Sequence, residues 1–135
     1  MKVLPILFLS LLPVASLAEE GLTFSPYHYQ AKIVSVYDGD TVTLDVDLGF
    51  SITSRQKIRL YGIDTPELRG EERPEGIKAR DYLRKLCPVG STILLKTQKD
   101  RQGKYGRYLG TLYKADLNVN QHLVDKGYAT IYMRK

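Results

Sequence analysis

The chain has 135 residues, with 20 Lys and Arg against 15 Asp and Glu, which gives a formal net charge of +5 at pH 7. This length allows one domain with one hydrophobic core, and the positive charge favours polyanionic partners. The single cysteine, Cys87, excludes an internal disulfide. We interpret it as a small apolar residue at a helix end, and a reactive or intermolecular thiol is the alternative.

The N-terminus has the pattern of a signal peptide. A short basic start is followed by an apolar stretch over 3–14 and by the small residues Ser16 and Ala18, which predicts cleavage after Ala18. An anchoring helix is the alternative, but the apolar run is shorter than the roughly 20 residues that span a membrane. We therefore expect a signal peptide over 1–18, an N-terminal arm over 19–29, a domain over 30–135, and a secreted or periplasmic protein.

Three strands are predicted in the first half of the domain, over 30–36, 41–48 and 52–61. The second is the clearest, because apolar residues at even positions from Val42 to Leu48 alternate with Thr and Asp. Asp38-Gly39 separates the first two strands and is predicted to be a hairpin turn, since both residue types tolerate positive φ.

The second half predicts two helices and two strands. A surface loop over 68–73 precedes a helix over 74–87, which has Pro74 at its start. Strands over 92–97 and 107–113 flank a polar loop over 98–106, and a capping box of Asn118 and Gln121 opens a short helix that Gly127 ends. This order predicts a mainly β protein with α (α+β), a partly open five-stranded Greek-key barrel of the oligonucleotide-binding (OB) class with two helices.

The residue inventory limits the hydrolytic chemistry. With only His28, His122 and Cys87, a zinc site built from nitrogen and sulfur ligands is excluded, whereas calcium or magnesium would bind oxygen ligands. A ribonuclease mechanism with paired histidines remains open, although His28 lies in the arm and His122 on a predicted surface helix.

Acidic residues occur where predicted strands begin and end. Asp40 follows the first hairpin, and Asp64 and Glu67 follow the third strand. Their carboxylates are candidates to converge on a hard cation. The alternative is that Asp38, Asp40 and Asp64 only stabilise turns and that Glu67 is solvated.

Two arginines favour the functional interpretation. Arg59 lies between Ile58 and Leu60 in an apolar strand, and Arg107 ends the segment Lys104-Tyr105-Gly106-Arg107. A guanidinium group is suited to bidentate contact with phosphate, so the pattern indicates an anion held beside a cation. A basic surface loop is the alternative for the second segment.

Taken in order, the blocks Asp38-Gly39-Asp40-Thr41, Ile58-Arg59-Leu60 with Asp64-Thr65-Pro66-Glu67, and Lys104-Tyr105-Gly106-Arg107 resemble the staphylococcal nuclease (thermonuclease) family. The similarity runs over 31–132 and includes Val119-Asn120 in the second predicted helix. The resemblance implies a calcium-dependent, sugar-nonspecific nuclease that hydrolyses DNA and RNA and leaves 3′-phosphates.

The resemblance also implies a role for individual residues. Asp40, Asp64 and the Thr65 carbonyl would ligate Ca²⁺, and Glu67 would orient or deprotonate the attacking water. Arg59 and Arg107 would hold the scissile phosphate and stabilise its developing charge. Contacts to the nucleotide would come from Lys104, Tyr105 and Tyr132, the last as a stacking residue.

The chain departs from the family pattern in a shorter 68–73 loop and in ending before the family's third C-terminal helix, so we expect a barrel without that helix. We expect a monomer with no stable protein partner, no membrane contact after signal cleavage, and a preference for single-stranded DNA and RNA. The rival hypothesis is a non-catalytic OB-fold module that binds nucleic acid or protein. It explains the paired carboxylates poorly, because without a metal they would repel a phosphate.

Overall fold

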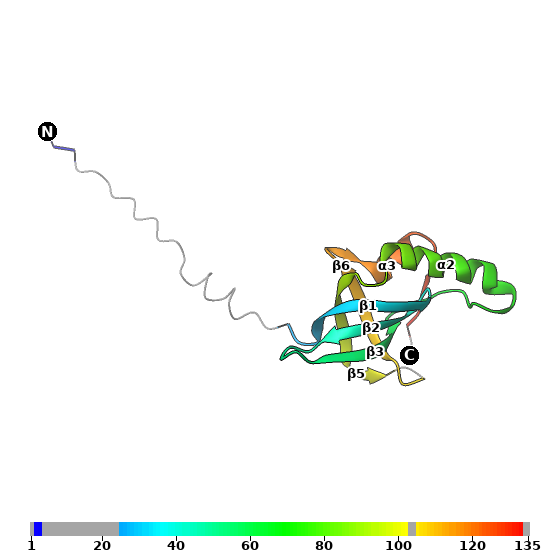
Figure 1. Cartoon of the computed structure of the whole chain (residues 1–135). Coiled ribbons are helices and arrows are strands. Elements are labelled where there is room, and N and C mark those ends of the chain that lie inside the picture. The colour runs from blue at the N-terminus through cyan, green and yellow to red at the C-terminus, as the bar shows by residue number, and fades with distance from the viewer. Residues whose placement is uncertain (1, 4–24, 103–104, 134–135) are drawn as a thin grey trace.

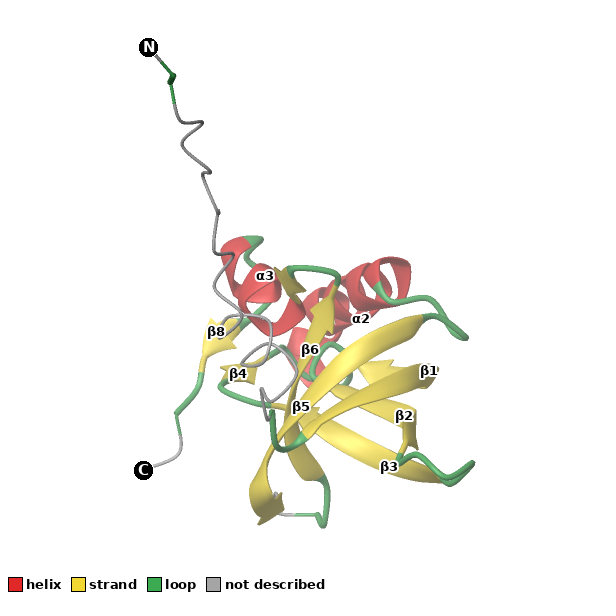
Figure 2. Cartoon of the chain, turned by 90° about the vertical axis from the view of Figure 1, so that its left-hand side faces the viewer, coloured by secondary structure: helices red, strands yellow, loops and turns green. Residues whose placement is uncertain are grey.

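The computed structural model describes residues 2–3, 25–102 and 105–133. The elements, in order, are β1 (His28–Asp38), β2 (Thr41–Asp47), β3 (Thr53–Leu60), β4 (Ile63–Asp64), the 3-10 helix η1 (Gly70–Glu72), α2 (Arg73–Leu86), β5 (Thr92–Gln102), β6 (Tyr108–Lys114), β7 (Leu117–Asn118), α3 (Val119–Asp125) and β8 (Thr130–Ile131). Both helices lie on the same side of the strands (Figures 1 and 2). Within the described part of the chain, no helix is long and apolar enough to cross a membrane.

The five long strands form the predicted barrel. Their order in the sheet is β3-β2-β1-β5-β6, and parallel pairing between β3 and β6 joins the two edges. This closing ladder has only three residue pairs, from Ile58↔Tyr108 to Leu60↔Gly110. The ladder therefore closes the barrel from Ile58 to Leu60, and a cavity of about 240 Å³, lined in part by Ile58 and Tyr108, lies at the Ile58 end of the ladder.

Alternating apolar side chains fill the barrel, as the sequence predicts. Val42, Leu44 and Val46 of β2 are at most 4% exposed, and their neighbours Thr43 and Asp45 are only partly buried. Leu48 departs from the prediction, because β2 ends at Asp47 and Leu48 is 48% exposed. The chain turns there through Phe50 and Ser51, both with positive φ.

Several boundaries differ from the sequence prediction. β1 begins at His28, inside the expected arm, and β5 continues to Gln102, through half of the expected polar loop. Part of the expected 68–73 loop is helical, since η1 leads directly into α2. Pairing with a neighbouring strand extends β1 and β5 where the sequence has little alternation.

The turn at Asp38-Gly39 is also built differently from the prediction. Neither residue has a positive φ, so the hairpin does not depend on the glycine's conformational freedom. A Cβ on Gly39 would instead lie 2.8 Å from the Ala79 Cβ and 2.8 Å from the Thr65 Cγ2. The glycine is required because α2 and the segment after β4 pack directly against this turn.

The helices fix the parts of the chain that surround this turn. α2 buries Ala79 and Leu83 and contacts β1. α3 begins where predicted, with the Asn118 side chain accepting a hydrogen bond from the Gln121 N–H at 3.0 Å, and its end is followed by Gly127 at φ 80°. The predicted capping box is only half formed, because the Gln121 side chain donates to Asp125 Oδ1 at 2.9 Å. Three two-residue strands were not predicted, and one of them, β8, pairs Thr130 with Asp64.

Candidate active site

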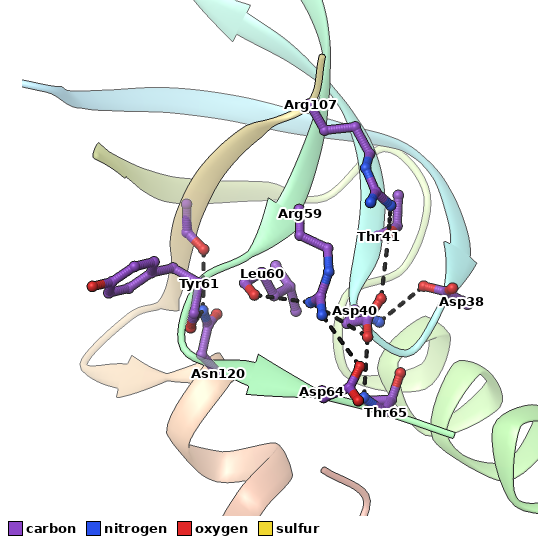
Figure 3. A network of polar contacts seen from close by, with 11 residues as sticks. Asp38, Asp40, Thr41, Arg59, Leu60, Tyr61, Asp64, Thr65, Arg107 and Asn120 are labelled. Atoms are coloured by element: carbon purple, nitrogen blue, oxygen red, sulfur yellow. Dashed lines mark hydrogen bonds and ion pairs between the residues drawn. The ribbon is translucent and has the colours of Figure 1, made fainter. Parts of the chain in front are cut away.

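The predicted carboxylates Asp40 and Asp64 meet at one guanidinium group (Figure 3). Asp40 lies in the turn between β1 and β2, and Asp64 ends β4. Arg59 Nη1 is 3.3 Å from Asp40 Oδ2, and Nη2 is 3.2 Å from Asp64 Oδ1. Two carboxylates separated by 23 residues of sequence therefore face the same point at the end of the barrel.

Asp40 is the most constrained of these groups, with only 6% of its surface exposed. The Thr65 N–H donates to its Oδ2 at 3.0 Å, and the Thr41 hydroxyl donates to its Oδ1 at 3.3 Å. Its backbone carbonyl accepts from the Leu60 N–H at 2.7 Å. These contacts hold the Asp40 carboxylate against the Asp64-Thr65 segment.

Asp38 adds a third carboxylate to this region. Its Oδ1 accepts a hydrogen bond from the Asp40 N–H at 3.0 Å. Burial, together with the nearby negative charge of Asp40, raises the pKa of Asp38 to about 6. Burial and the Asp40 charge also raise the pKa of Asp64, against the lowering effect of Arg59. Ionisation of both carboxyl groups is thus disfavoured first by burial and second by the negative charge of Asp40.

Arg107 provides the second guanidinium. It precedes β6 and donates from Nη1 to the Thr41 hydroxyl at 3.0 Å, and its Cζ lies 5.1 Å from the centre of the Tyr105 ring. Its Nε is buried without a hydrogen-bond partner among the described residues. Since Thr41 pairs with Arg59 across β2 and β3, both arginines lie beside the same turn.

Glu67 lies at the edge of this group and is exposed. Its backbone N–H donates to Glu72 Oε2 at 3.0 Å. Its carbonyl rests on Gly76 of α2, where an added Cβ would clash with the Glu67 backbone. Gly76 therefore positions this segment. A glycine within a predicted helix was the sequence signal for such a close approach.

The other predicted contact residues are placed differently. Tyr105 lines the same cleft as Arg59 and Arg107. Tyr132 is 50% exposed and its N–H donates to the Gly62 carbonyl at 2.8 Å, but it is not among the residues that line the cleft. Lys104 lies outside the described residues.

The cleft has a volume of about 1090 Å³. The described residues give it seven basic and four acidic side chains: Lys57, Arg59, Arg69, Arg73, Arg80, Arg84 and Arg107, with Asp38, Asp40, Asp64 and Glu67. The sequence reasoning did not single out the four arginines contributed by α2 and the loop before it. A cleft with this charge and volume suits a polyanion larger than one phosphate group.

The donor groups fit a hard cation in their chemistry. Asp40, Asp64 and the Thr65 carbonyl offer only oxygen, the preferred ligand of calcium and magnesium. Burial is the largest cause of the raised pKa values of Asp38 and Asp64, and the negative charge of Asp40 adds to it, so a cation bound nearby would favour their ionised forms. Among the described residues, no group of three or more His, Cys, Asp and Glu side chains is arranged to hold a metal ion.

Comparison with known proteins agrees with this arrangement. The family model described as "Staphylococcal nuclease homologue" matches residues 57–135. An uncharacterised protein of Methanocaldococcus jannaschii is 30% identical over 130 residues, covering 78% of this chain and 60% of that protein. Endonuclease YhcR of Bacillus subtilis is 32% identical over 113 residues, covering 77% of this chain and 9% of the endonuclease. A thermonuclease of Staphylococcus hyicus is 29% identical over 101 residues, covering 73% of this chain and 56% of the thermonuclease.

The chain spans less than two thirds of the length of each of these relatives. The family model, in contrast, matches more than half of the chain and contains Arg59, Asp64, Glu67 and Arg107. Together with the five-stranded barrel and the paired carboxylates at its end, this match shows that the chain belongs to the staphylococcal nuclease family.

Proposed function

We propose that this chain is a calcium-dependent nuclease that hydrolyses phosphodiester bonds in DNA and RNA to 3′-phosphate products. The observation that carries the proposal is the bridge from Arg59 to both Asp40 and Asp64, beside Arg107, in a predominantly basic cleft. Two carboxylates would repel a phosphate, so their presence at a basic site favours a cation bound together with the phosphate.

The arginines would bind and stabilise the reacting phosphate. Arg59 and Arg107 approach the same turn from β3 and from the start of β6. This common position supports the proposal that the two guanidinium groups contact different oxygens of one phosphate. Charge that gathers on those oxygens in the transition state would be neutralised by guanidinium groups already held in position.

Asp40, Asp64 and the Thr65 carbonyl would hold the cation. Bound there, calcium would polarise a phosphoryl oxygen and lower the pKa of a coordinated water. The contacts of Asp40 with Thr65 and Thr41 would help to hold its carboxylate in place, and Arg59, which now bridges Asp40 and Asp64, would turn toward the phosphate when the cation binds.

Glu67 would orient the attacking water and accept its proton. Its carboxylate lines the cleft and is exposed to solvent, which permits access of water. The water oxygen would form the new bond to phosphorus as its proton passes to Glu67, the bond to the 5′ oxygen would break, and that oxygen would take up a proton from solvent. The products are a 3′-phosphate and a 5′-hydroxyl.

Purified protein lacking residues 1–18 would test the proposal on single-stranded DNA and RNA, with calcium and with excess chelator. Hydrolysis of both substrates is expected only with calcium. Arg59→Ala and Arg107→Ala should each reduce turnover by roughly a hundredfold or more, as loss of one preorganised donor does. Undiminished hydrolysis in chelator would exclude the metal role, and binding without hydrolysis would favour a non-catalytic module.

We also propose that the protein is exported, with cleavage after Ala18, and acts as a monomer outside the cytoplasm. The support is the apolar 3–14 stretch followed by Ser16 and Ala18. Mass spectrometry of the protein from its native host would identify the N-terminus. A mature protein that begins at Met1 would contradict export by this route.

A further inference from the structure

The cleft extends across the sheet beyond the two catalytic arginines. Ser35 of β1 pairs with Thr43 of β2, and Thr43 pairs with Lys57 of β3. All three line the cleft. They form a polar row across three strands, adjacent to the row in which Thr41 pairs with Arg59.

The spacing of the two rows suits consecutive phosphates. Lys57 and Arg59 are two residues apart on one strand, so both side chains emerge from the same face about 7 Å apart. This is similar to the separation of neighbouring phosphates in an extended nucleic acid strand. The Lys57 side chain is exposed and has no hydrogen-bond or ion-pair partner among the described residues.

Tyr37 lies at the β1 end of the same cleft and is 66% exposed. A tyrosine ring with this much accessible surface, beside a basic groove, is typical of a platform on which a base stacks. The neighbouring Val36 carbonyl accepts two hydrogen bonds from Arg84, from Nε at 3.3 Å and Nη2 at 3.0 Å. This contact holds a positive charge of α2 next to Tyr37.

One row farther along the strands, the basic side chain is paired with an acidic one. There Asp45 accepts hydrogen bonds from Arg55, from Nε at 2.8 Å and from Nη2 at 3.0 Å. Neither residue lines the cleft. Because the Arg55–Asp45 pair is neutral, the sheet provides only one further phosphate-binding position in this direction, next to that of the scissile phosphate.

We propose that Lys57, with Thr43 and Ser35, binds the phosphate next to the scissile one in a single nucleic acid strand, and that Tyr37 stacks on a base of that strand. The inference rests on the proposed function for the class of ligand and extends it to a polymer that occupies at least two phosphate subsites. A substrate with a single phosphodiester would not reach this second subsite.

Binding provides a test that does not need catalysis. Fluorescence anisotropy would measure the affinity of the protein for fluorescein-labelled (dT)12 in chelator over a range of salt concentrations. Lys57→Gln should weaken binding by about tenfold, as loss of a hydrogen bond to a charged group does. It should also lower the slope of log affinity against log salt by about 0.7, the change expected for one contact to a single-strand phosphate.

Two variants distinguish the parts of the subsite. Tyr37→Leu should weaken binding by about tenfold with no change in the salt slope, since stacking releases no counterions. Lys126→Gln removes an exposed lysine outside the cleft and should leave both quantities unchanged. Equal effects of Lys57→Gln and Lys126→Gln, or a salt slope unchanged by Lys57→Gln, would overturn the proposal.

Kinetics separate failure of this inference from failure of the proposed function. With calcium, Lys57→Gln should raise KM on the oligonucleotide by about tenfold, in line with its weaker binding. It should leave kcat/KM on a nitrophenyl phosphodiester of thymidine, which has one phosphate, unchanged. An equal loss on both substrates would contradict a second subsite. If the wild-type protein hydrolysed neither substrate, the proposed function would fail, while the binding experiment would still decide the subsite.

Discussion

Asp38→Asn should stabilise the metal-free protein at neutral pH, because it removes a charge that the fold disfavours. The Asp38 Oδ1 accepts a hydrogen bond from the Asp40 N–H at 3.0 Å, and an asparagine oxygen would keep this contact. Burial, followed by repulsion from Asp40, raises the pKa of Asp38 from its ordinary 3.8 to about 6 in the folded protein. The variant therefore removes both the burial of a charge and its repulsion by Asp40, without removing the turn.

The direction of the pH dependence follows from proton binding. Between about pH 4 and 6 the folded protein retains the Asp38 proton and the unfolded chain releases it, so the free energy of unfolding of the wild type falls as the pH rises. Above pH 6 the whole cost of ionisation is present, and below pH 4 it is absent. At 1.36 kcal/mol for each pKa unit, the cost is about 3 kcal/mol before screening. Because the side chain is only partly buried, solvent screening should reduce it to about 1–2 kcal/mol.

Urea unfolding of the wild type and of Asp38→Asn, both in chelator, would measure this difference at pH 3.5 and pH 7.5. The variant should be more stable by about 1–2 kcal/mol at pH 7.5 and nearly equal to the wild type at pH 3.5. Calcium should reduce the advantage at pH 7.5, because a bound cation would offset the repulsion in the wild type. An equal difference at both pH values, or a less stable variant at pH 7.5, would refute the electrostatic reasoning.

Three further changes test how the site is supported. Asn120→Ala should lower the free energy of unfolding by about 2–4 kcal/mol, because the buried amide donates to the Tyr61 and Gly110 carbonyls at 3.0 and 3.1 Å and accepts from the Leu112 N–H at 3.2 Å. A loss below about 1 kcal/mol in urea unfolding would argue against this role. Gly76→Ala should destabilise the fold by about 1–3 kcal/mol and reduce nuclease turnover, because the added Cβ would displace the Glu67 backbone. The control is Lys78→Ala, at an exposed position of the same helix, which should change neither stability nor turnover. Cys87 is fully buried, and burial raises the pKa of its thiol. A thiol reagent should therefore modify Cys87 in urea but not in the native protein. Rapid labelling of the native protein would favour the alternative of a reactive thiol.

The sequence alone determined the local elements and the types of group that could carry the chemistry. Alternation in β2 predicted which side chains enter the barrel, and Asn118 marked the start of α3, because both patterns depend on residues close together in the chain. Asp40, Arg59, Asp64 and Arg107 were identified as candidates from their residue type and from the resemblance. Their residue types and their positions near predicted strands and turns did not require a structure.

Only the tertiary structure decided how these groups meet. Arg59 bridges Asp40 and Asp64 because the turn after β1 and the segment after β4 pack together, which requires the absence of a side chain at Gly39. The arginines of α2 face the cleft because that helix packs against β1, and Tyr132 lies outside it. Contacts between residues far apart in the chain depend on how strands and helices pack, and residue patterns within a single segment do not specify that packing.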